Sequence, residues 1–534
     1  MLSNAMEKAN SASAAAEEPT TVTGQPRAGD YVYPDKLDAA TLRIAGVCVL
    51  ASMMAILDVT VVSVAQRTFI LEFGSTQAVV AWTMTGYTLA LTTVIPITGW
   101  AADRFGTKRL WMGSVLAFAL GSLLCAMAPN ILLLILFRVV QGIGGGMLMP
   151  LGFMILTRVA GPKRLGRMMA VLGIPMLLGP ICGPILGGWL IGTLSWPWIF
   201  LVNLPIGVTA FALAAHEFPP DRPVPSETFD LIGVLLLSPG LATFLFGVSS
   251  VPGRGTVADR HVLVPAIIGL VLIGTFIFRA WYRTDHPLID LRLYTNRVFS
   301  QASVTLLFFA VAFFGTGLLL PSYLQQALHQ TPMQSGVFLI PQGLGAMLTM
   351  PLAGAFMDRH GPGKSVLLGL TLITTGLATF TFGVAKDADY RPTLLVGLAI
   401  MGLGMGCTMM PLSGAAVQTL TPHEIARGST LISVNQQVGG SIGTALMSMV
   451  LTNQFNRSEN IAAANKLALL QQGAARRGIP VDPNSIPAQT LAPDFNDKVL
   501  HDLCHSYTVV LVLGCALMAV TLIPASFLPR KPAA

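Results

Sequence analysis

Two charged side chains stand well inside long apolar segments of this chain, where charges are rare. Asp58 lies in segment 42–65 and Arg138 in segment 131–156. A charge at membrane depth costs about 3 kcal/mol on insertion scales, so such a residue is a candidate functional site. A buried carboxylate can also take up and release a proton, because burial disfavours its charged form. The two residues therefore predict a proton-coupled membrane protein.

The two charges are predicted to lie at one depth. If the first segment runs outward and the other inward, Asp58 and Arg138 are each about seven residues, or roughly 10 Å, from the outer end. Opposite charges at one depth can stabilise each other, and a proton on Asp58 would weaken the pair. We interpret them as a proton-coupling pair. The alternative is an ion pair that only fixes helix packing.

The elements that would position this pair are membrane-spanning helices. Of the 534 residues, 53% are hydrophobic and 11% are charged, whereas a soluble domain carries about 25% charged residues. A spanning helix needs about 20 mostly apolar residues. Segments of this kind lie at 42–65, 79–101, 109–128, 131–156, 168–194, 196–215, 229–250, 262–282, 298–322, 333–357, 364–385, 393–418, 428–453 and 506–528. The predicted fold is an all-α membrane protein with fourteen transmembrane helices.

The loops between these segments indicate the orientation. Lys and Arg are about twice as frequent on the side of the termini as on the other side, which is typical of the cytoplasmic side. The polar residues 1–41 and 529–534 are therefore predicted to be cytoplasmic tails, the first of them disordered. We expect a multi-pass protein of the cell membrane, surrounded by lipid.

Other kinds of chemistry are not indicated. The net charge of +7 is spread through short loops, which argues against a nucleic-acid partner. The six cysteines have no metal-ligand spacing, so no metal site is expected. No nucleotide-binding or hydrolase motif occurs in the sequence. An enzyme is not predicted, and no cofactor is expected other than protons as the coupling ion.

A loop motif occurs twice. GWAADRFGTKR (99–109) follows the second segment, and GAFMDRHGPGK (354–364) follows the tenth. The copies predict two matching six-helix halves, 42–215 and 298–528, with an inserted helix pair and its flanking loops at 216–297. The candidate gating residues are Gly99, Asp103, Arg104, Gly106, Lys108, Arg109, Asp358, Arg359 and Gly361. These loops either form a gate contact that breaks when the halves move, or serve topology and folding.

The loop 454–505 is long and lies on the outer side of the predicted fold. It contains an Ala/Gln/Asn-rich helical part and then a stretch with several prolines. We expect a loose surface loop, and the alternative is a cover over the outer mouth.

The fifth segment contains a repeated G-P pattern. Glycines at 179, 183 and 187 line one helix face and allow close backbone approach. The prolines remove backbone donors and favour a bend. The pattern comprises Gly179, Pro180, Gly183, Pro184, Gly187 and Gly188. Candidates for the lining of a substrate cavity are Trp82, Tyr87, Gln141, Asn435 and Gln436.

Taken together, these motifs resemble those of the major facilitator superfamily, and specifically its fourteen-span drug:proton antiporters. LDVTVVSVA (57–65) resembles the first-helix motif and places its Asp on Asp58. LFRVVQGIGGG resembles the fourth-helix motif and places its Arg on Arg138 and its Gln-Gly on Gln141 and Gly142. GWAADRFGTKR resembles the loop motif after the second helix, and LGPICGPILGG the fifth-helix antiporter motif.

The resemblance implies alternating access between two six-helix bundles, with export driven by inward proton flow. We therefore expect a proton-coupled exporter of amphipathic drugs or related hydrophobic compounds. The alternative is export of a native lipid, siderophore or metabolite on the same fold, and a non-transporting receptor or scaffold is less favoured. The resemblance leaves open whether an accessory envelope protein takes part.

Overall fold

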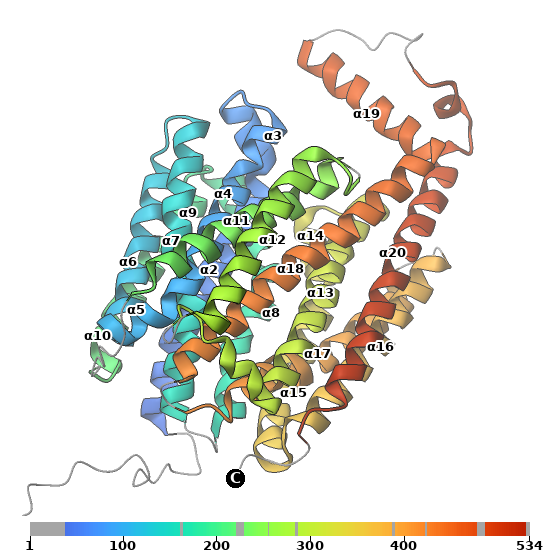
Figure 1. Ribbon diagram of the computed structural model, residues 1–534. Helices are drawn as coiled ribbons and strands as arrows, with labels where there is room; N and C mark the ends of the chain where they lie inside the picture. Colours follow the sequence, from blue (N-terminus) through green and yellow to red (C-terminus); the bar gives the residue numbers. More distant parts are fainter. Residues whose placement is uncertain are drawn as a thin grey trace, which may run out of the picture. The chain divides into compact units, whose positions relative to one another are not determined.

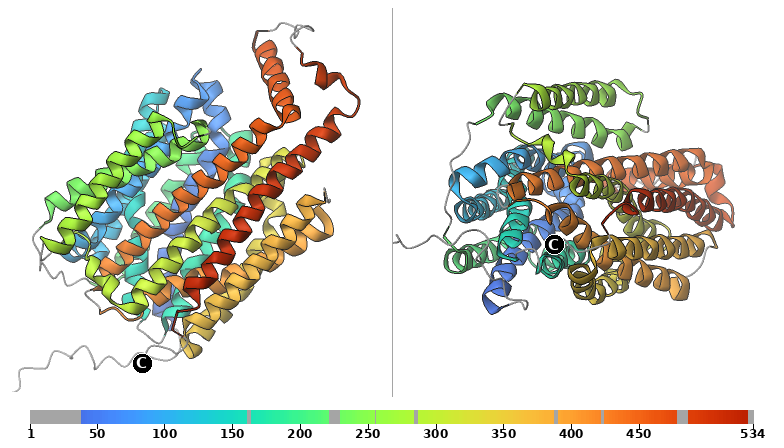
Figure 2. Two further views of the ribbon diagram at one scale, coloured as in Figure 1. Left: turned by 45° about the vertical axis from the view of Figure 1, so that its right-hand side comes forward. Right: turned by 60° about the horizontal axis from the view of Figure 1, so that its bottom comes forward.

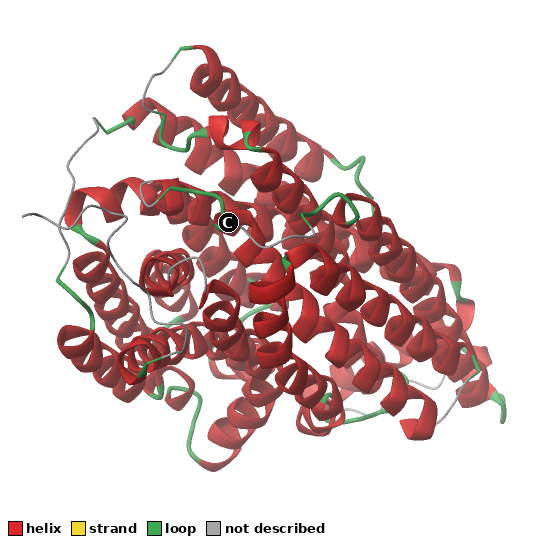
Figure 3. Cartoon of the chain, turned by 90° about the horizontal axis from the view of Figure 1, so that it is seen from below, coloured by secondary structure: helices red, strands yellow, loops and turns green. Residues whose placement is uncertain are grey.

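The structure is a computed structural model that describes residues 38–160, 164–220, 229–254, 256–283, 287–386, 390–421, 424–477 and 486–529. Throughout these residues the regular structure is helical, with short connections (Figure 3). The predicted tails fall almost wholly outside the described residues. The first helix, α2 (Ala39–Glu72), begins three residues earlier than the predicted segment, because Asp38 caps it by accepting a hydrogen bond from the Thr41 backbone N–H at 3.2 Å.

The helices of the first half surround α2 and α7. They are α2, α3 (Gln77–Val80), α4 (Trp82–Val94), η1 (Ile95–Ile97), α5 (Thr98–Phe105), α6 (Thr107–Ala126), α7 (Ile131–Ala160), α8 (Leu165–Thr193), α9 (Trp198–Leu201) and α10 (Asn203–Glu217). α2 packs against α8, α10 and α7, and α7 also packs against α4 and α6. The predicted span 79–101 is interrupted at the 3₁₀ turn η1, where Pro96 has no backbone N–H to continue the helix.

Two long helices lie in the region 216–297, for which an inserted pair is predicted. α11 (Leu231–Arg254) packs against α12 (Arg260–Tyr282), and α11 also contacts α4 and α18. The pair (green) lies beside both the early and the late helices in Figure 2. Asp230 joins the start of α11 to the end of α12. Its buried carboxylate accepts hydrogen bonds from Arg279 at 2.7 and 2.9 Å and from the Leu288 N–H at 3.1 Å.

The second half repeats the pattern of long packed helices. Its elements are η3 (Leu291–Thr295), α13 (Arg297–Gln326), α14 (Pro332–Phe338), α15 (Ile340–His360), α16 (Pro362–Ala385), the π-helical turn η4 (Tyr390–Leu394), α17 (Leu395–Val417), α18 (Glu424–Arg457), α19 (Glu459–Arg477), η6 (Ala488–Leu491) and α20 (Phe495–Ala525). α17 packs against α15 and α16, while α13 packs against α18 and α20.

Eleven helices of the described residues are long and apolar enough to cross a membrane. The other three predicted spans correspond to the interrupted α4–η1–α5, to α8 and to α18. The core between the helices is apolar and includes fully buried rings such as those of Trp111 and Phe153.

In its described part, the segment 454–505 contains the predicted helix, but this helix is fixed by side-chain contacts and is not part of a loose loop. α18 continues to Arg457, α19 follows after one residue, and α20 already begins at Phe495. Asp502 fixes the start of α19, because its carboxylate accepts hydrogen bonds from Ser458 Oγ at 2.6 Å and Asn460 Nδ2 at 3.0 Å. Residues 478–485, which hold part of the proline-rich stretch, lie outside the described residues.

The two copies of the loop motif form the same kind of turn between two helices. Gly106 ends α5 and begins α6, and Gly361 ends α15 and begins α16. We call the end of the helices that carries these turns the turn end. The opposite end, with α3 and α19, is the far end (Figure 1).

Candidate functional site

Asp58 and Arg138 form an ion pair between α2 and α7. Arg138 Nη1 donates to Asp58 Oδ2, and both side chains are 0% exposed. A charge of this kind is stable in the interior only when it is paired and hydrogen-bonded. The pair therefore lies in the packed interior of the early helices, and its remaining polar atoms require partners.

The second carboxylate oxygen of Asp58 has two amide donors. Gln141 Nε2 donates to Oδ1 at 2.9 Å, and Asn203 Nδ2 donates to the same atom at 3.0 Å. Gln141 Oε1 in turn accepts from Arg138 Nη1 at 2.7 Å, which closes a ring of three side chains. Asn203 Nδ2 also donates to Ser122 Oγ at 3.0 Å. The cluster thus joins α2, α6, α7 and α10.

The guanidinium of Arg138 is held from α4 as well. Its Nε donates to the backbone oxygen of Thr83 at 3.0 Å, and its Cζ lies 4.1 Å from the centroid of the Tyr87 ring. An arginine over an aromatic face is attracted by the ring quadrupole, most strongly where water is excluded. The position of the charge is therefore set by the turn of α4 that carries Thr83 and Tyr87.

Two buried polar atoms of this cluster lack a hydrogen-bond partner among the described residues. They are Arg138 Nη2 and the Tyr87 hydroxyl. Buried polar groups are nearly always satisfied, so such atoms call for a reason. Both atoms lie where α4 meets α7.

The charge of Asp58 is what balances the rest of this arrangement. A proton on Asp58 would remove the charge that compensates Arg138, and an uncompensated buried charge costs about 3–5 kcal/mol. Proton binding would therefore favour a conformation in which the Arg138 guanidinium finds new partners or water.

The glycines of α8 bring that helix against α2, next to Asp58. A methyl group added at Gly179 would collide with Ile56, and one at Gly183 with Thr60. Thr60 Oγ1 also lies 3.2 Å from the Gly179 carbonyl oxygen, to which it can donate. Gly187 lies against Val61, Gly188 is exposed with open space around it, Pro184 is half-buried, and the side chain of Pro180 is outside the described set. The small face therefore allows α8 to lie close to the helix that carries the carboxylate.

The first loop motif lies at the turn end against α18 and α10. A methyl group at Gly99 would lie 3.1 Å from Thr430 Oγ1 of α18. Lys108 Nζ donates to the backbone oxygens of Ala215 and Phe218, each at 2.8 Å, and so fixes the start of α6 to the end of α10.

The charged residues of the two motifs differ in their surroundings. Asp103 faces Arg158 of α7 with an N–O distance of 3.6 Å. Arg104, Arg109 and Arg359 are exposed, and the side chain of Asp358 is outside the described set.

The candidates for the cavity lining do not gather at one place. Tyr87 and Gln141 belong to the ion-pair cluster. Trp82 is 41% exposed and stacks on Phe246 of α11, with ring centroids 5.6 Å apart. Asn435 Nδ2 donates to the Tyr294 hydroxyl at 3.2 Å, and Gln436 is half-buried on the same helix.

Three residues of the cluster are absent from the prediction: Ser122, Thr83 and Asn203. Asn203 stands in the apolar stretch WIFLVNLPIG (198–207), where an amide is as unusual as Asn435 is in α18. An amide in an apolar stretch is a signal that the sequence itself contains. Ser122 and the backbone oxygen of Thr83 carried none, because hydroxyl groups are common in spanning helices and a carbonyl has no sequence signature.

Comparisons with known proteins agree with this architecture. The family model described as Major Facilitator Superfamily matches residues 48–444. "Multidrug resistance protein B homolog" of Mycobacterium tuberculosis (strain ATCC 25618 / H37Rv) is 69% identical over 533 residues, which cover 100% of this chain and 98% of the relative. "Multidrug export protein EmrB" of Escherichia coli (strain K12) is 29% identical over 415 residues, covering 76% of this chain and 79% of the relative.

The fold likewise matches solved structures. The human organic anion transporter MFSD10 (TETRAN) superposes with a TM-score of 0.57 at 15% identity, over 90% of this chain and 99% of that one. At this identity the likeness concerns the fold alone. Given the family match and the 69% identical relative, the chain belongs to the Major Facilitator Superfamily, among its multidrug-efflux transporters.

Proposed function

We propose that this protein exports amphipathic compounds in exchange for protons, and that Asp58 carries the proton. The observation that supports this most directly is the buried Asp58–Arg138 pair, with its amide ring and two unpaired polar atoms. A buried carboxylate that is paired with one arginine and held by amide donors is a place where a single proton would change the stability of the whole cluster.

The proposed architecture has fourteen spans, which adds the interrupted α4–η1–α5, α8 and α18 to the eleven apolar helices. Two six-helix bundles, 42–215 and 298–528, would rock against each other, with α11 and α12 as an inserted pair. Contacts of α5 and α7 with α18, and of α8 with α15 and α17, join the two sets of helices. With the turn end on the cytoplasmic side, as the Lys and Arg distribution favours, the contact at Gly99 would close the cytoplasmic entrance.

The coupling would proceed through the ion pair. Entry of a proton from outside neutralises Asp58 and weakens its bond to Arg138, so that α2 and α7 can shift and open the site to the cytoplasm. Loss of the proton to the cytoplasm restores the pair. One charge moved through 100 mV is worth about 2.3 kcal/mol, enough for roughly a fortyfold gradient of a neutral substrate.

Amphipathic substrates are proposed for two reasons. The relatives carry the names "Multidrug resistance protein B homolog" and "Multidrug export protein EmrB". In addition, Met350, Met405 and Met410 are buried on α15 and α17, and Met350 and Met410 lie where α8 meets these helices. Flexible, polarizable methionines can adapt to apolar surfaces of different shapes.

The experiment is proton-gradient-driven efflux of ethidium from vesicles that carry wild type or Asp58→Asn. Asp494→Asn is the matched control, because Asp494 is an exposed carboxylate paired with Lys498 at 2.7 Å. We expect the wild type and the control to transport the dye uphill and Asp58→Asn to be inserted but inactive. Uphill transport by Asp58→Asn would show that the proton is carried elsewhere. No transport by any folded form would shift the substrate search to native lipids and metabolites.

A further inference from the structure

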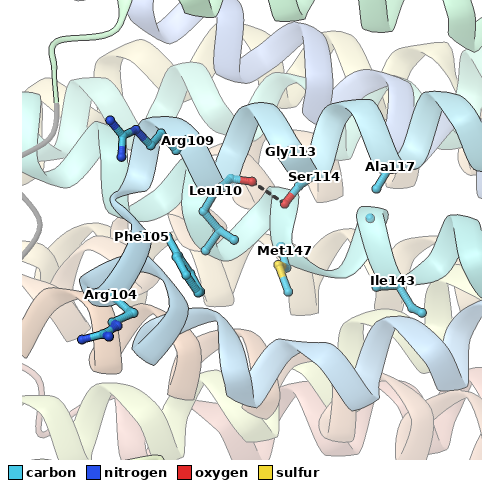
Figure 4. Close-up of a pocket in the computed structure, with 10 residues that line it drawn as sticks. Arg104, Phe105, Arg109, Leu110, Gly113, Ser114, Ala117, Ile143 and Met147 are labelled. Carbon is cyan, nitrogen blue, oxygen red and sulfur yellow. Dashed lines mark hydrogen bonds between the residues drawn. The ribbon is translucent and has the colours of Figure 1, made fainter. Parts of the chain in front are cut away.

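A groove of about 430 Å³ lies between α6 and α7, apart from the ion-pair cluster. Its apolar walls come from Leu110, Gly113 and Ala117 of α6 and from Ile143, Gly144 and Met147 of α7. The one hydroxyl in its lining, that of Ser114, already donates to the Leu110 backbone oxygen at 2.8 Å (Figure 4). Along its length the groove can therefore contact an apolar chain, and its lining there has no unpaired hydroxyl group.

Gly113 leaves room in this groove. A methyl group added there would meet nothing within 4 Å. The neighbouring surface is apolar and open, since Leu116, Leu120 and Ile143 are 49%, 52% and 45% exposed. In a membrane protein such a surface faces lipid, so the groove is reached directly from the bilayer.

Two guanidinium groups stand at one end of the groove, at the turn end. Arg104 on the last turn of α5 and Arg109 on the first turn of α6 lie on either side of Phe105 (Figure 4). Both are exposed, and among the described residues neither has an ion pair or a hydrogen bond. Their loop neighbours Asp103 and Lys108 are engaged with protein groups. The two arginines are thus free to bind an anion.

The dimensions fit one leaflet of a bilayer. Ala117 is eight residues beyond Arg109 on α6, about 12 Å at 1.5 Å per residue. Half of a hydrocarbon core of about 30 Å is roughly 15 Å. An anion held by the arginines would therefore lie at the level of the headgroups while an attached chain follows the groove toward the middle of the bilayer.

We propose that this groove binds an anionic phospholipid of the cytoplasmic leaflet. Its phosphate lies between Arg104 and Arg109, and one acyl chain lies along Gly113 and Met147. The bound headgroup bridges α5 and α6 across Gly106, which steadies the loop that holds Asp103. The two arginines disfavour a cationic amphipath in the same place, and the apolar length of the groove disfavours a free phosphate ion. The leaflet assignment rests on the orientation proposed above.

The test compares lipid effects on the thermal unfolding of the full-length protein in detergent micelles. Dioleoylphosphatidylglycerol is the anionic probe, dioleoylphosphatidylcholine is the neutral one, and glycerol phosphate is the headgroup without chains. Two variants act on the two parts of the site. Arg104→Gln with Arg109→Gln removes the charges, and Gly113→Leu fills the groove. Matched controls are Arg283→Gln, an exposed arginine, and Gly274→Leu, an exposed helical glycine with open space around it.

We expect the anionic lipid to raise the Tm of wild type and both controls more than the neutral lipid does. Both site variants should lose this difference. At about 1 kcal/mol for each arginine near the surface, removing both should weaken binding of the anionic lipid roughly thirtyfold. Native mass spectrometry would count the lipid that remains bound.

Three outcomes would overturn the proposal. The first is a lipid response in the site variants equal to that of wild type. The second is equal stabilisation by both lipids, which would indicate an apolar site without charge recognition. The third is full stabilisation by glycerol phosphate that Gly113→Leu leaves intact, which would indicate an anion site only. Because the readout is lipid binding in micelles, inactive transport would contradict the proposed function without affecting this result.

Discussion

Gly106 and Gly361 adopt nearly the same backbone conformation, 255 positions apart in the sequence. Their φ angles are 89° and 83°, and their ψ angles are 147° and 161°. Each N–H donates to the carbonyl oxygen four residues earlier, that of Ala102 at 3.0 Å and of Met357 at 2.9 Å. The region is essentially restricted to glycine, because a Cβ clashes with the backbone there. The internal repeat is therefore a repeat of one turn geometry, and the geometry accounts for the glycine in both copies.

Alanine at either turn should destabilise the protein. Gly106→Ala and Gly361→Ala each force an L side chain into this region, at a cost of about 1–3 kcal/mol. The measurement is thermal unfolding in detergent. Gly46→Ala is the control, because Gly46 lies in α2 with nothing near its missing side chain. A Tm for both turn variants equal to that of the control would contradict the prediction.

Asn203 should contribute to the stability of the ion pair as well as to its position. Asn203→Leu keeps the size of the side chain but leaves Asp58 Oδ1 with Gln141 as its one amide donor and Ser122 Oγ without a donor. We expect a loss of about 1–3 kcal/mol in the free energy of unfolding, together with slower proton-driven dye efflux. Asn465→Leu, on the exposed face of α19, should change neither. Normal stability and normal efflux in Asn203→Leu would show that the amide is dispensable.

The contact between α8 and α2 can be tested by moving the glycine from one helix to the other, from position 183 to position 60. Gly183→Ala places a methyl group against Thr60 and should lower the Tm strongly. Thr60→Gly removes the obstructing side chain, although glycine within a helix itself costs about 1 kcal/mol relative to alanine. The double variant should therefore be more stable than the sum of the two single losses predicts. Gly188→Ala, with open space around it, is the neutral control. Strictly additive losses would mean that the two positions do not touch.

Asp103 should affect transport far more than stability. Its pair with Arg158 has side chains that are 16% and 35% exposed, and pairs of this kind contribute roughly 0.5 kcal/mol after solvent screening. Asp103→Asn is therefore expected to unfold near the wild-type temperature while its efflux rate falls, since the contact would be made only in one conformation. Asp494→Asn breaks an exposed ion pair at the start of α20 and should leave the efflux rate unchanged. Efflux at the wild-type rate in Asp103→Asn would reduce this pair to a structural role.

Much of the candidate site was accessible from the sequence, because membranes impose strict rules. Apolar length sets the helix boundaries, and a fixed rise per residue converts position into depth. Counting residues from the ends of the predicted segments put Asp58 and Arg138 at one depth, and the structure places them in contact, although α2 runs on to Glu72, beyond the predicted end at 65. The turn glycines were equally accessible, since the motif repeats.

The contacts that could not be predicted from the sequence depend on which neighbour each helix face meets. Trp82 was a candidate for the cavity lining, yet its ring stacks on Phe246 of α11, a neighbour that no local pattern specifies. Asn203 was overlooked although it stands in an apolar stretch. In segment 454–505, the composition predicted the helical part that α19 forms, but no local pattern specified the side-chain contacts across more than forty residues through which Asp502 fixes it.

α8 meets the rest of the molecule through two very different surfaces. Toward α2 it presents glycines so close to Ile56 and Thr60 that even a methyl group does not fit. Toward α15 and α17, Gly173 rests instead on the long side chains of Met350 and Met410. The contact with α2 is thus tight and made by short branched side chains, whereas the contact with α15 and α17 is made by flexible methionine side chains. Any relative movement of the two sets of helices would take place on the methionine side, carrying α8 and the Asp58 helix together as one body.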